Sequence, residues 1–337
     1  MNFFDKNYYF KLAKKKDIVL ILNFLKKYWR QDHLLIKDYK LFEYEYCDKE
    51  KVNFVIAFNK KNKKINALQG FIPYSSDKKF LHICGSITLV KPNIKTPLLG
   101  IETMKRMFVK TKPFSYCGIG TNPTTMKPLV EKFFNRHTDI MHHHYYLNPE
   151  VSKFKIAKIE EKFIGKSLNN KILFTEIKKF KDLNKKINFK RKFSNLPFKS
   201  KSYIKKRYFE HPKFNYKFFI IEKKNLLISR EIFIKKYNKA ILSIVDFVGE
   251  TKQLGKINYL LNELMKDKKY EYIDILCTKN ISKILVKAGF KIKDEKSKNI
   301  IPIYFQPFVR KNIKIFYETS NKNMVLFKAD ADQDRPN

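Results

Sequence analysis

The sequence predicts an α/β protein of two domains, each a mixed, mostly antiparallel sheet with flanking helices. The first observation is a pattern that occurs twice, at residues 86–148 and 240–308: strand, helix, strand, helix, last strand. The second is length, since 337 residues suffice for two domains of ordinary size. The third is a hydrophobic content of 44%, with 31 Phe and 19 Tyr, which can fill a sizeable core.

Hydrophobic periodicity predicts the elements of the first domain. Apolar residues recur at helical spacing over 17–30, so that Ile18, Leu22, Leu25 and Trp29 share one face. Polar residues 59–62 mark a turn between strands. The remaining elements expected in this domain are three strands over 52–60, 64–73 and 80–90, a helix over 98–108, a strand over 115–120, a helix over 124–134 and a strand over 140–147.

The second domain repeats this order. A short helix over 202–209 should precede three strands, two strand–helix pairs and a closing strand over 300–308. Residues 151–200 show less hydrophobic periodicity, and we interpret them as a connector with one or two secondary-structure elements. We therefore expect domains at 1–150 and 201–337 with this connector between them.

The composition is strongly basic, but it does not point to nucleic acid. The formal net charge is +40 at pH 7, from 72 Lys and Arg against 32 Asp and Glu. Only eight of the basic residues are Arg, whereas a protein selected to bind phosphates should favour the planar guanidinium fork. The lysines are scattered and accompany many Asn, Ile, Phe and Tyr residues, which all have A/T-rich codons. We attribute the charge to mutational bias and expect no nucleic-acid partner, although the positive field should attract phosphorylated substrates.

The sequence gives no indication of a membrane span, a secretion signal or a metal site. No run of 18 apolar residues occurs, and the N-terminus lacks an apolar signal region. The spacing of Cys47, Cys84, Cys117 and Cys277 matches neither a zinc site nor a disulfide framework. We expect a cytoplasmic protein.

Five segments carry a resemblance to a known superfamily: residues 65–73, 84–104, 118–133, 240–264 and 279–290. Their order is similar to the GNAT fold of the GCN5-related N-acetyltransferases. In that fold a strand splayed from its neighbour leads into a Gly-containing loop and a helix that hold the pyrophosphate of acyl-CoA. The whole chain, including HYYLN and the end DQDRPN, also resembles tandem-GNAT proteins encoded in bacterial surface-polysaccharide gene clusters.

The resemblance implies acyl-CoA as co-substrate and points to two loops. Gly100 lies in the first loop, and Gln253, Gly255 and Lys256 lie in the second. A glycine lets the backbone approach a pyrophosphate at a helix N-terminus, but an ordinary loop glycine before a helix is equally compatible with both positions. Because Pro97 removes a donor from the first loop, we expect the second half to bind acyl-CoA better. Neither half has the Tyr that often protonates the leaving thiolate, so the alternative that one half is a degenerate copy stays open.

Two residues are candidates for the chemistry itself. Asp246 lies inside the apolar run SIVDFV, where an unpaired carboxylate is costly to bury, so we predict a general base; a helix N-cap or an exposed ion pair is the alternative. Tyr304 is the candidate donor to a thiolate or oxyanion, with core packing as the alternative.

His144 and Tyr146 are candidate substrate contacts or members of a proton relay. His142 and His144 share one face of the expected strand, but two His ligands alone make a weak metal case, and none is predicted. Aromatic packing is the alternative for both candidates.

The C-terminus holds the one acidic cluster that stands out in a Lys-rich chain. Asp330, Asp332 and Asp334 alternate as in a calcium loop, but the loop Gly and distal Glu are missing. We expect the tail to fold back, with Asp334 and Arg335 near the substrate; a disordered tail is the alternative. On this basis, deletion of residues 330–337 should lower turnover and barely change the melting temperature.

The function predicted from these observations is a GNAT-type N-acyltransferase. The acyl group would pass from acetyl-CoA or another acyl-CoA to the amine of a nucleotide-linked amino sugar in surface-polysaccharide biosynthesis. Two alternatives remain open: Fem-type aminoacyl transfer from a charged tRNA, and a non-catalytic carbohydrate-binding GNAT-like protein.

Overall fold

The chain forms two compact units. The computed structural model describes residues 2–75, 77, 79–165, 172–187, 196–294, 296–331 and 334–336. The first unit comprises Met1–Thr138, Glu318–Asn321 and Arg335–Asn337. The second comprises Asp139–Tyr317 and Lys322–Asp334.

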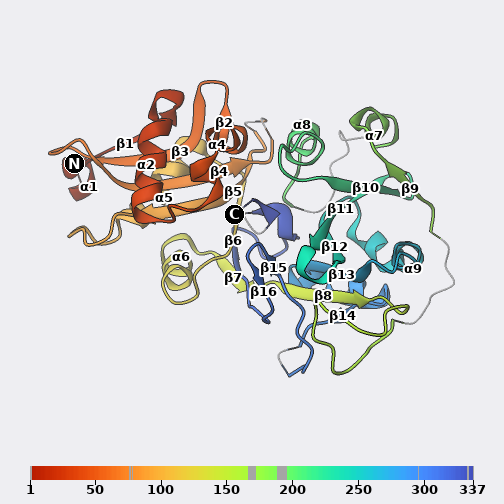
Figure 1. Cartoon of the computed structure of the whole chain (residues 1–337). Coiled ribbons are helices and arrows are strands. Elements are labelled where there is room, and N and C mark those ends of the chain that lie inside the picture. The colour runs from red at the N-terminus through yellow and green to blue at the C-terminus, as the bar shows by residue number, and fades with distance from the viewer. Residues whose placement is uncertain are drawn as a thin grey trace. The chain divides into compact units, whose positions relative to one another are not determined.

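The first unit is built on a sheet of mixed direction (Figure 1). Its strand order is β1-β3-β4-β5-β6-β17-β7, with β2 paired to β3. Neighbours from β1 to β5 run antiparallel, whereas β5 and β6 are parallel. The strands are β1 (Tyr8–Lys14), β2 (Cys47–Asp48), β3 (Lys51–Asn59), β4 (Ile65–Pro73), β5 (His82–Val90), β6 (Ser115–Ile119), β7 (His137–Ile140) and β17 (Phe316–Thr319).

Helices cover both faces of this sheet, because alternate residues of each strand point to opposite sides. Phe54 of β3 stacks on Phe42 of α4, with ring centroids 5.7 Å apart. Its neighbour Val55 packs instead with Met104 and Met107 of α5. The helices are α1 (Phe3–Asn7), α2 (Ile18–Tyr28), α3 (Leu34–Lys37), α4 (Tyr39–Tyr46), α5 (Leu99–Thr111) and α6 (Met126–Phe134), with a 3₁₀ turn η1 (Lys15–Asp17).

The second unit has its own mixed sheet in the order β14-β8-β13-β12-β11-β10-β9. The parallel pair here is β12 with β13. The strands are β8 (His142–Leu147), β9 (Phe174–Ile177), β10 (Tyr216–Ile221), β11 (Asn225–Ile234), β12 (Lys239–Val248), β13 (Tyr270–Cys277) and β14 (Lys291–Ile292); a separate hairpin holds β15 (Tyr304–Phe305) and β16 (Phe308–Val309).

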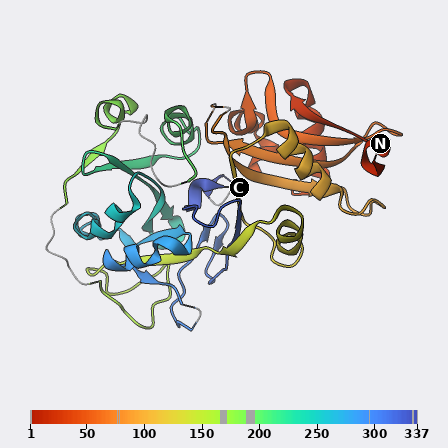
Figure 2. The same cartoon turned by 180° about the vertical axis from the view of Figure 1, so that it is seen from behind.

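Short helices complete the second unit. Figure 2 shows both sheets from the side opposite to Figure 1. The helices are α7 (Phe180–Lys186), α8 (Lys201–Ile204), α9 (Asn258–Met265) and α10 (Ser282–Lys287), with a π-helical turn η2 (Lys205–Phe209) and 3₁₀ turns η3 (Lys235–Tyr237), η4 (Thr251–Lys256), η5 (Lys279–Ile281) and η6 (Lys328–Asp330).

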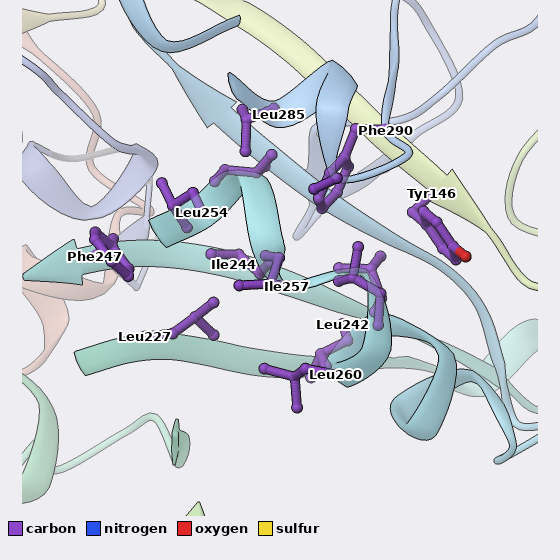
Figure 3. Close-up of a cluster of buried hydrophobic side chains, with 14 of the residues drawn as sticks. Tyr146, Leu227, Leu242, Ile244, Phe247, Leu254, Ile257, Leu260, Leu285 and Phe290 are labelled. Carbon is purple, nitrogen blue, oxygen red and sulfur yellow. The ribbon is translucent and has the colours of Figure 1, made fainter. Parts of the chain in front are cut away.

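The main core of the second unit lies between one sheet face and helices α9 and α10 (Figure 3). Leu242 and Ile244 of β12 point toward Leu260 of α9 and Leu285 of α10. All four side chains are fully buried or nearly so. Burial of such a side chain stabilises the fold by about 1.5–3 kcal/mol.

The structure confirms the predicted fold class, with one sheet of mixed direction in each unit. The strands expected from β3 to β6 and from β10 to β13 are present within a few residues of their predicted bounds. Strand β1 and helices α3 and α4 were not predicted. The face expected for the helix at 17–30 needs correction, because Trp29 follows α2 and is 36% exposed.

The expected boundaries at residues 150 and 200 differ from the division that the structure shows. Strand β8 pairs with β13 and β14, so the second unit begins at Asp139. The expected connector also belongs to the second unit, since Ile156 is fully buried in its core and β9 pairs with β10. Residues 166–171 and 188–195 of that connector lie outside the described residues.

The closing strand expected at 300–308 is wrong. Pro302 and Pro307 have no N–H to donate, which excludes them from a central strand. Those residues form the small β15–β16 hairpin instead, and β8 takes the place beside β13. Strand β17, from near the C-terminus, holds the corresponding place beside β6 in the first sheet.

None of the helices in the described ranges is long and apolar enough to cross a membrane.

Candidate active site

In both units the parallel pair of strands separates before the strands end. The β5–β6 ladder stops at Cys84 and Cys117, although β5 continues to Val90. The β12–β13 ladder stops at Ile244 and Ile275, although β12 continues to Val248. Each unit therefore has an opening between two strands at the start of a following helix.

The opening of the second unit contains part of the chain itself. Phe327 forms a bridge with Cys277, and the Thr278 N–H donates to the Leu326 carbonyl at 3.1 Å. Val325 and Phe327 belong to the core of this unit. The cavity left beside β12 measures about 30 Å³, the share of a single water molecule in the liquid.

Asp246, the predicted general base, is completely buried in an ion-pair network. Its Oδ1 lies 2.5 Å from the Lys199 ammonium, and the Tyr208 hydroxyl donates to Oδ2 at 2.5 Å. Lys199 also pairs with Asp330 at 2.6 Å. Asp246 thus forms a buried ion pair, which is neither the helix N-cap nor the exposed ion pair of the alternative, and both of its oxygens are already engaged.

The residues expected to bind acyl-CoA in the second unit have local structural explanations. A side chain at Gly255 would lie 3.3 Å from Ile284, so the glycine permits close packing of η4 on α10. Gln253 and Lys256 also lie in η4, and both line a polar cavity of about 240 Å³ with Asn225. Tyr304 lies in β15, whose partner is β16 in the separate hairpin.

His144 and Tyr146 are buried on β8. The Tyr146 hydroxyl donates to Asn262 at 2.6 Å, and its ring packs on Phe290. Burial lowers the pKa of His144 to about 3, so its imidazole is neutral at physiological pH. Packing therefore accounts for Tyr146, and His144 lacks the near-neutral pKa of a proton relay.

The C-terminus folds back, as expected. Asp334 is 1% exposed and accepts from Arg230 and Tyr216 in the second unit. Arg335 is buried and pairs with Glu45 in the first unit. Both groups assigned to substrate are thus bound by residues of the chain, and Asp332 lies outside the described residues.

The opening of the first unit has a helix start without a side-chain cap. Leu98 adopts a left-handed conformation, with φ 59°, and gives no capping hydrogen bond to α5. Gly100 follows in the first turn, where a side chain would lie 3.0 Å from Val90. The N–H groups of such a turn, with the exposed Lys95 in the preceding loop, suit an anion.

A carboxyl group with a perturbed pKa lies beside this opening. Glu318 of β17 is 4% exposed, and it would contact a side chain placed at Gly118 of β6. Burial raises the pKa of Glu318 to about 7, although Arg136 and a hydrogen bond from Tyr116 oppose the shift. The Glu318 Oε2 atom has no hydrogen-bond partner among the described residues.

Tyr116 of β6 reaches across to β5 near the point where these two strands separate. Its hydroxyl lies so close to β5 that a side chain at Gly85 would be 2.1 Å away. The Arg136 guanidinium lies over the Tyr116 ring at 4.8 Å. Burial raises the pKa of Tyr116, so the phenol stays neutral and can only orient Glu318 by donating to it.

The raised pKa of Glu318 should lower the stability of the protein at alkaline pH. The folded pKa of about 7 exceeds the ordinary 4.5, so the stabilisation is complete below pH 4.5 and is lost as pH rises through 7. The ionised form then costs about 3 kcal/mol. We expect Glu318→Gln to raise the free energy of unfolding in urea at pH 8.5 by this order, and to have little effect at pH 4.5.

The matched control for this measurement is Glu176→Gln, which changes an exposed carboxylate on β9. It should leave the free energy of unfolding unchanged at both pH values. An equal effect of Glu318→Gln at the two pH values would contradict the raised pKa.

Sequence reasoning missed Glu318 although a signal was present. Glu318 stands in the short run IFYETS, a carboxylate beside β-formers, which is the same pattern that drew attention to Asp246. The sequence could not show the pairing of β17 with β6. Tyr116 and Ser320 are 204 positions apart, yet the Ser320 N–H donates to the Tyr116 carbonyl at 2.9 Å.

Solved structures with this fold are numerous. The chain is similar to a GCN5-related N-acetyltransferase from Kribbella flavida, with a TM-score of 0.54, 8% identity and coverage of 93% of this chain and 70% of that one. The chain is also similar to a GCN5-related N-acetyltransferase from Anabaena variabilis, with a TM-score of 0.54 and 8% identity. That match covers 92% of this chain and 72% of the other. The fold is that of the GCN5-related N-acetyltransferases.

A third similar structure contains a GCN5-related glucosamine N-acetyltransferase region within a fungal multi-domain β-N-acetylglucosaminidase. The TM-score is 0.51 and the identity 10%, and the match covers 93% of this chain and 38% of the other. No protein-family model and no curated protein matches the sequence. At these sequence identities the similarity shows the fold alone, so the chemistry has to be argued from the residues of the site.

Proposed function

We propose that the protein is an N-acyltransferase whose reaction takes place in the first unit. The observation that carries this proposal is Glu318: a buried carboxyl with a pKa of about 7 and an oxygen without a partner among the described residues. A general base works best when its pKa is near the operating pH. Its place beside the β5–β6 opening of a GNAT fold supports acyl transfer from acyl-CoA.

The proposed mechanism needs no covalent enzyme intermediate. The substrate ammonium gives one proton to Glu318, directly or through water, and the neutral amine attacks the thioester carbonyl. As the carbon–sulfur bond breaks, the tetrahedral intermediate gives up its second amine proton, which the leaving CoA thiolate takes up, and an amide remains. Glu318 then returns the first proton to solvent. Tyr116 positions Glu318 by its hydrogen bond and does not itself exchange a proton.

For the acceptor we propose the amine of a nucleotide-linked amino sugar in surface-polysaccharide biosynthesis. The support is the resemblance of the chain to tandem-GNAT proteins of such gene clusters, carried by segments such as HYYLN. The GNAT-fold glucosamine N-acetyltransferase region described above is an example of an amino sugar as acceptor in this fold.

The test is mass spectrometry of the purified protein incubated with acyl-CoAs and amino-sugar nucleotides. The proposal requires an acylated sugar and free CoA. Product formed only from charged tRNA would replace it with the Fem-type alternative. No product with binding of sugar alone would favour the non-catalytic alternative.

Acyl-CoA should bind to the loop that precedes α5 rather than to η4. Lys95 lies in the loop before α5 and Lys256 ends η4; both are exposed, one in each unit, so they can be compared as a pair. We expect Lys95→Glu to weaken acyl-CoA binding about tenfold by removing one phosphate contact and adding repulsion, and Lys256→Glu to leave it unchanged. Isothermal titration calorimetry measures both, and the reverse result would return the site to the second unit.

A further inference from the structure

Two arginines of the second unit, the buried Arg207 and the largely buried Arg230, converge on Asp334. The Arg230 fork donates to Oδ1 from Nε at 2.8 Å and from Nη2 at 2.7 Å. The Tyr216 hydroxyl donates to Oδ2 at 2.9 Å. Arg230 and Asp334 thus form a charge-assisted pair, in which the Asp334 side chain is fully buried.

The second arginine, Arg207, is poorly satisfied by this carboxylate. It is 3% exposed, and its Nη2 donates to the backbone carbonyl of Asp334 at 2.8 Å, whereas Oδ2 lies 3.6 Å away. Its Nη1 donates to Tyr216 at 2.8 Å. The remaining donor, Nε, has no partner among the described residues. A full guanidinium is therefore held mainly by neutral acceptors.

Among the described residues, the neighbouring acidic groups do not supply the missing counter-ion. Asp246 and Asp330 are both held by Lys199, at 2.5 and 2.6 Å. Burial lowers the pKa of His211, which lies near both arginines, to about 3, so it adds no charge at neutral pH. Two guanidiniums share one carboxylate in a desolvated place, where an uncompensated charge is costly.

A group with more negative charge and more acceptor oxygens would satisfy this arrangement better than a carboxylate does. A phosphate monoester or pyrophosphate has three or more oxygens in a tetrahedral array, so each guanidinium can take its own pair. Tyr216 adds a neutral donor between them. The Arg207 guanidinium, which within the described part of the chain donates only to the backbone carbonyl of Asp334 and to Tyr216, could then pair with an oxygen of the larger anion.

We propose that Arg207, Arg230 and Tyr216 form a phosphate-binding site that Asp334 fills in this structure. The ligand is a phosphate or pyrophosphate group of a small molecule, which displaces the Asp334 side chain when it binds. The site stands on the second unit and does not depend on the acyl-transfer proposal.

Calorimetric titration of inorganic pyrophosphate into the full chain tests the site. Asp334→Asn keeps the side-chain volume and removes the competing charge, so it should bind pyrophosphate at least tenfold more tightly than the wild type. Arg230→Gln should bind it at least tenfold more weakly. The matched control is Arg30→Gln, a change at an arginine whose side chain is 44% exposed, and it should bind like the wild type. Equal affinities in all four proteins would show binding to surface lysines and overturn the proposal.

A second measurement covers the case in which Asp334→Asn folds poorly. Hydrogen exchange of residues 322–331 in the wild type should become faster when pyrophosphate displaces Asp334, and should stay unchanged in Arg230→Gln. No change in the wild type at saturating pyrophosphate would also overturn the site. Uridine diphosphate and glucose 1-phosphate, titrated in the same way, separate a nucleotide source from a sugar-phosphate source by their relative affinities.

Discussion

Replacement of Lys199 by Met should destabilise the protein more than any other single change proposed for this chain. Lys199 is 5% exposed and is the cation shared by Asp246 and Asp330, which are 0% and 1% exposed. Removal of one partner from a buried ion pair leaves an uncompensated charge, at a cost of about 3–5 kcal/mol. We expect a loss of this order in the free energy of unfolding, measured by urea denaturation at pH 7.

The control is Lys181→Met, the same change at an exposed lysine of α7, which should alter the free energy of unfolding by less than about 0.5 kcal/mol. Similar losses for the two variants would contradict the ion-pair network around Lys199.

The buried ion pairs change the melting temperature that we expect after deletion of residues 330–337. The sequence alone predicts a small change in melting temperature, because few apolar contacts are lost. In the structure the deletion removes Asp330 and Asp334. Lys199 then keeps only one of its two carboxylates, Asp246, and Arg207 and Arg230 lose the carboxylate that they share. A marked fall in melting temperature is therefore expected.

Replacement of Glu318 by Gln should have the largest effect on turnover. The amide has the same shape but cannot accept a proton, so loss of a general base should lower kcat by about 100-fold or more. The pKa of about 7 predicts that the wild-type rate rises with pH up to neutrality and then levels off. In the variant this rise should be absent, while the dissociation constant of acyl-CoA stays the same.

A merely structural role for Glu318 predicts a different outcome. Tyr116→Phe provides the comparison, because it removes the hydrogen bond to the carboxyl and leaves the base in place. It should shift the pH profile and lower kcat only modestly. A Glu318→Gln enzyme with nearly full activity and the wild-type pH profile would falsify the assigned base.

The scarcity of arginine in this chain is a signal that the sequence holds and that charge counting overlooks. Lysine is the default cation here, and several of the few arginines lie where a planar fork with several donors is useful. Arg207, Arg230 and Arg335 are all buried or nearly so and pair with carboxylates. Their partners, in contrast, could not be inferred, since more than 100 residues separate Asp334 from Arg230.

The amino-acid sequence alone was enough to predict the order from β3 to β6 and from β10 to β13, because each of these elements is a local pattern: alternation in β3 and β12, helical spacing in α5. It also located the C-terminal cluster that folds back. Which charged groups meet could be seen only in the folded chain. Strand β17 pairs with β6, which brings Glu318 next to Tyr116. Asp246 forms its ion pair with Lys199. The physical reason is that hydrophobic periodicity is read within a dozen residues, whereas the pKa and reactivity of a carboxylate depend on burial and on partners that only the folded chain brings within hydrogen-bonding distance.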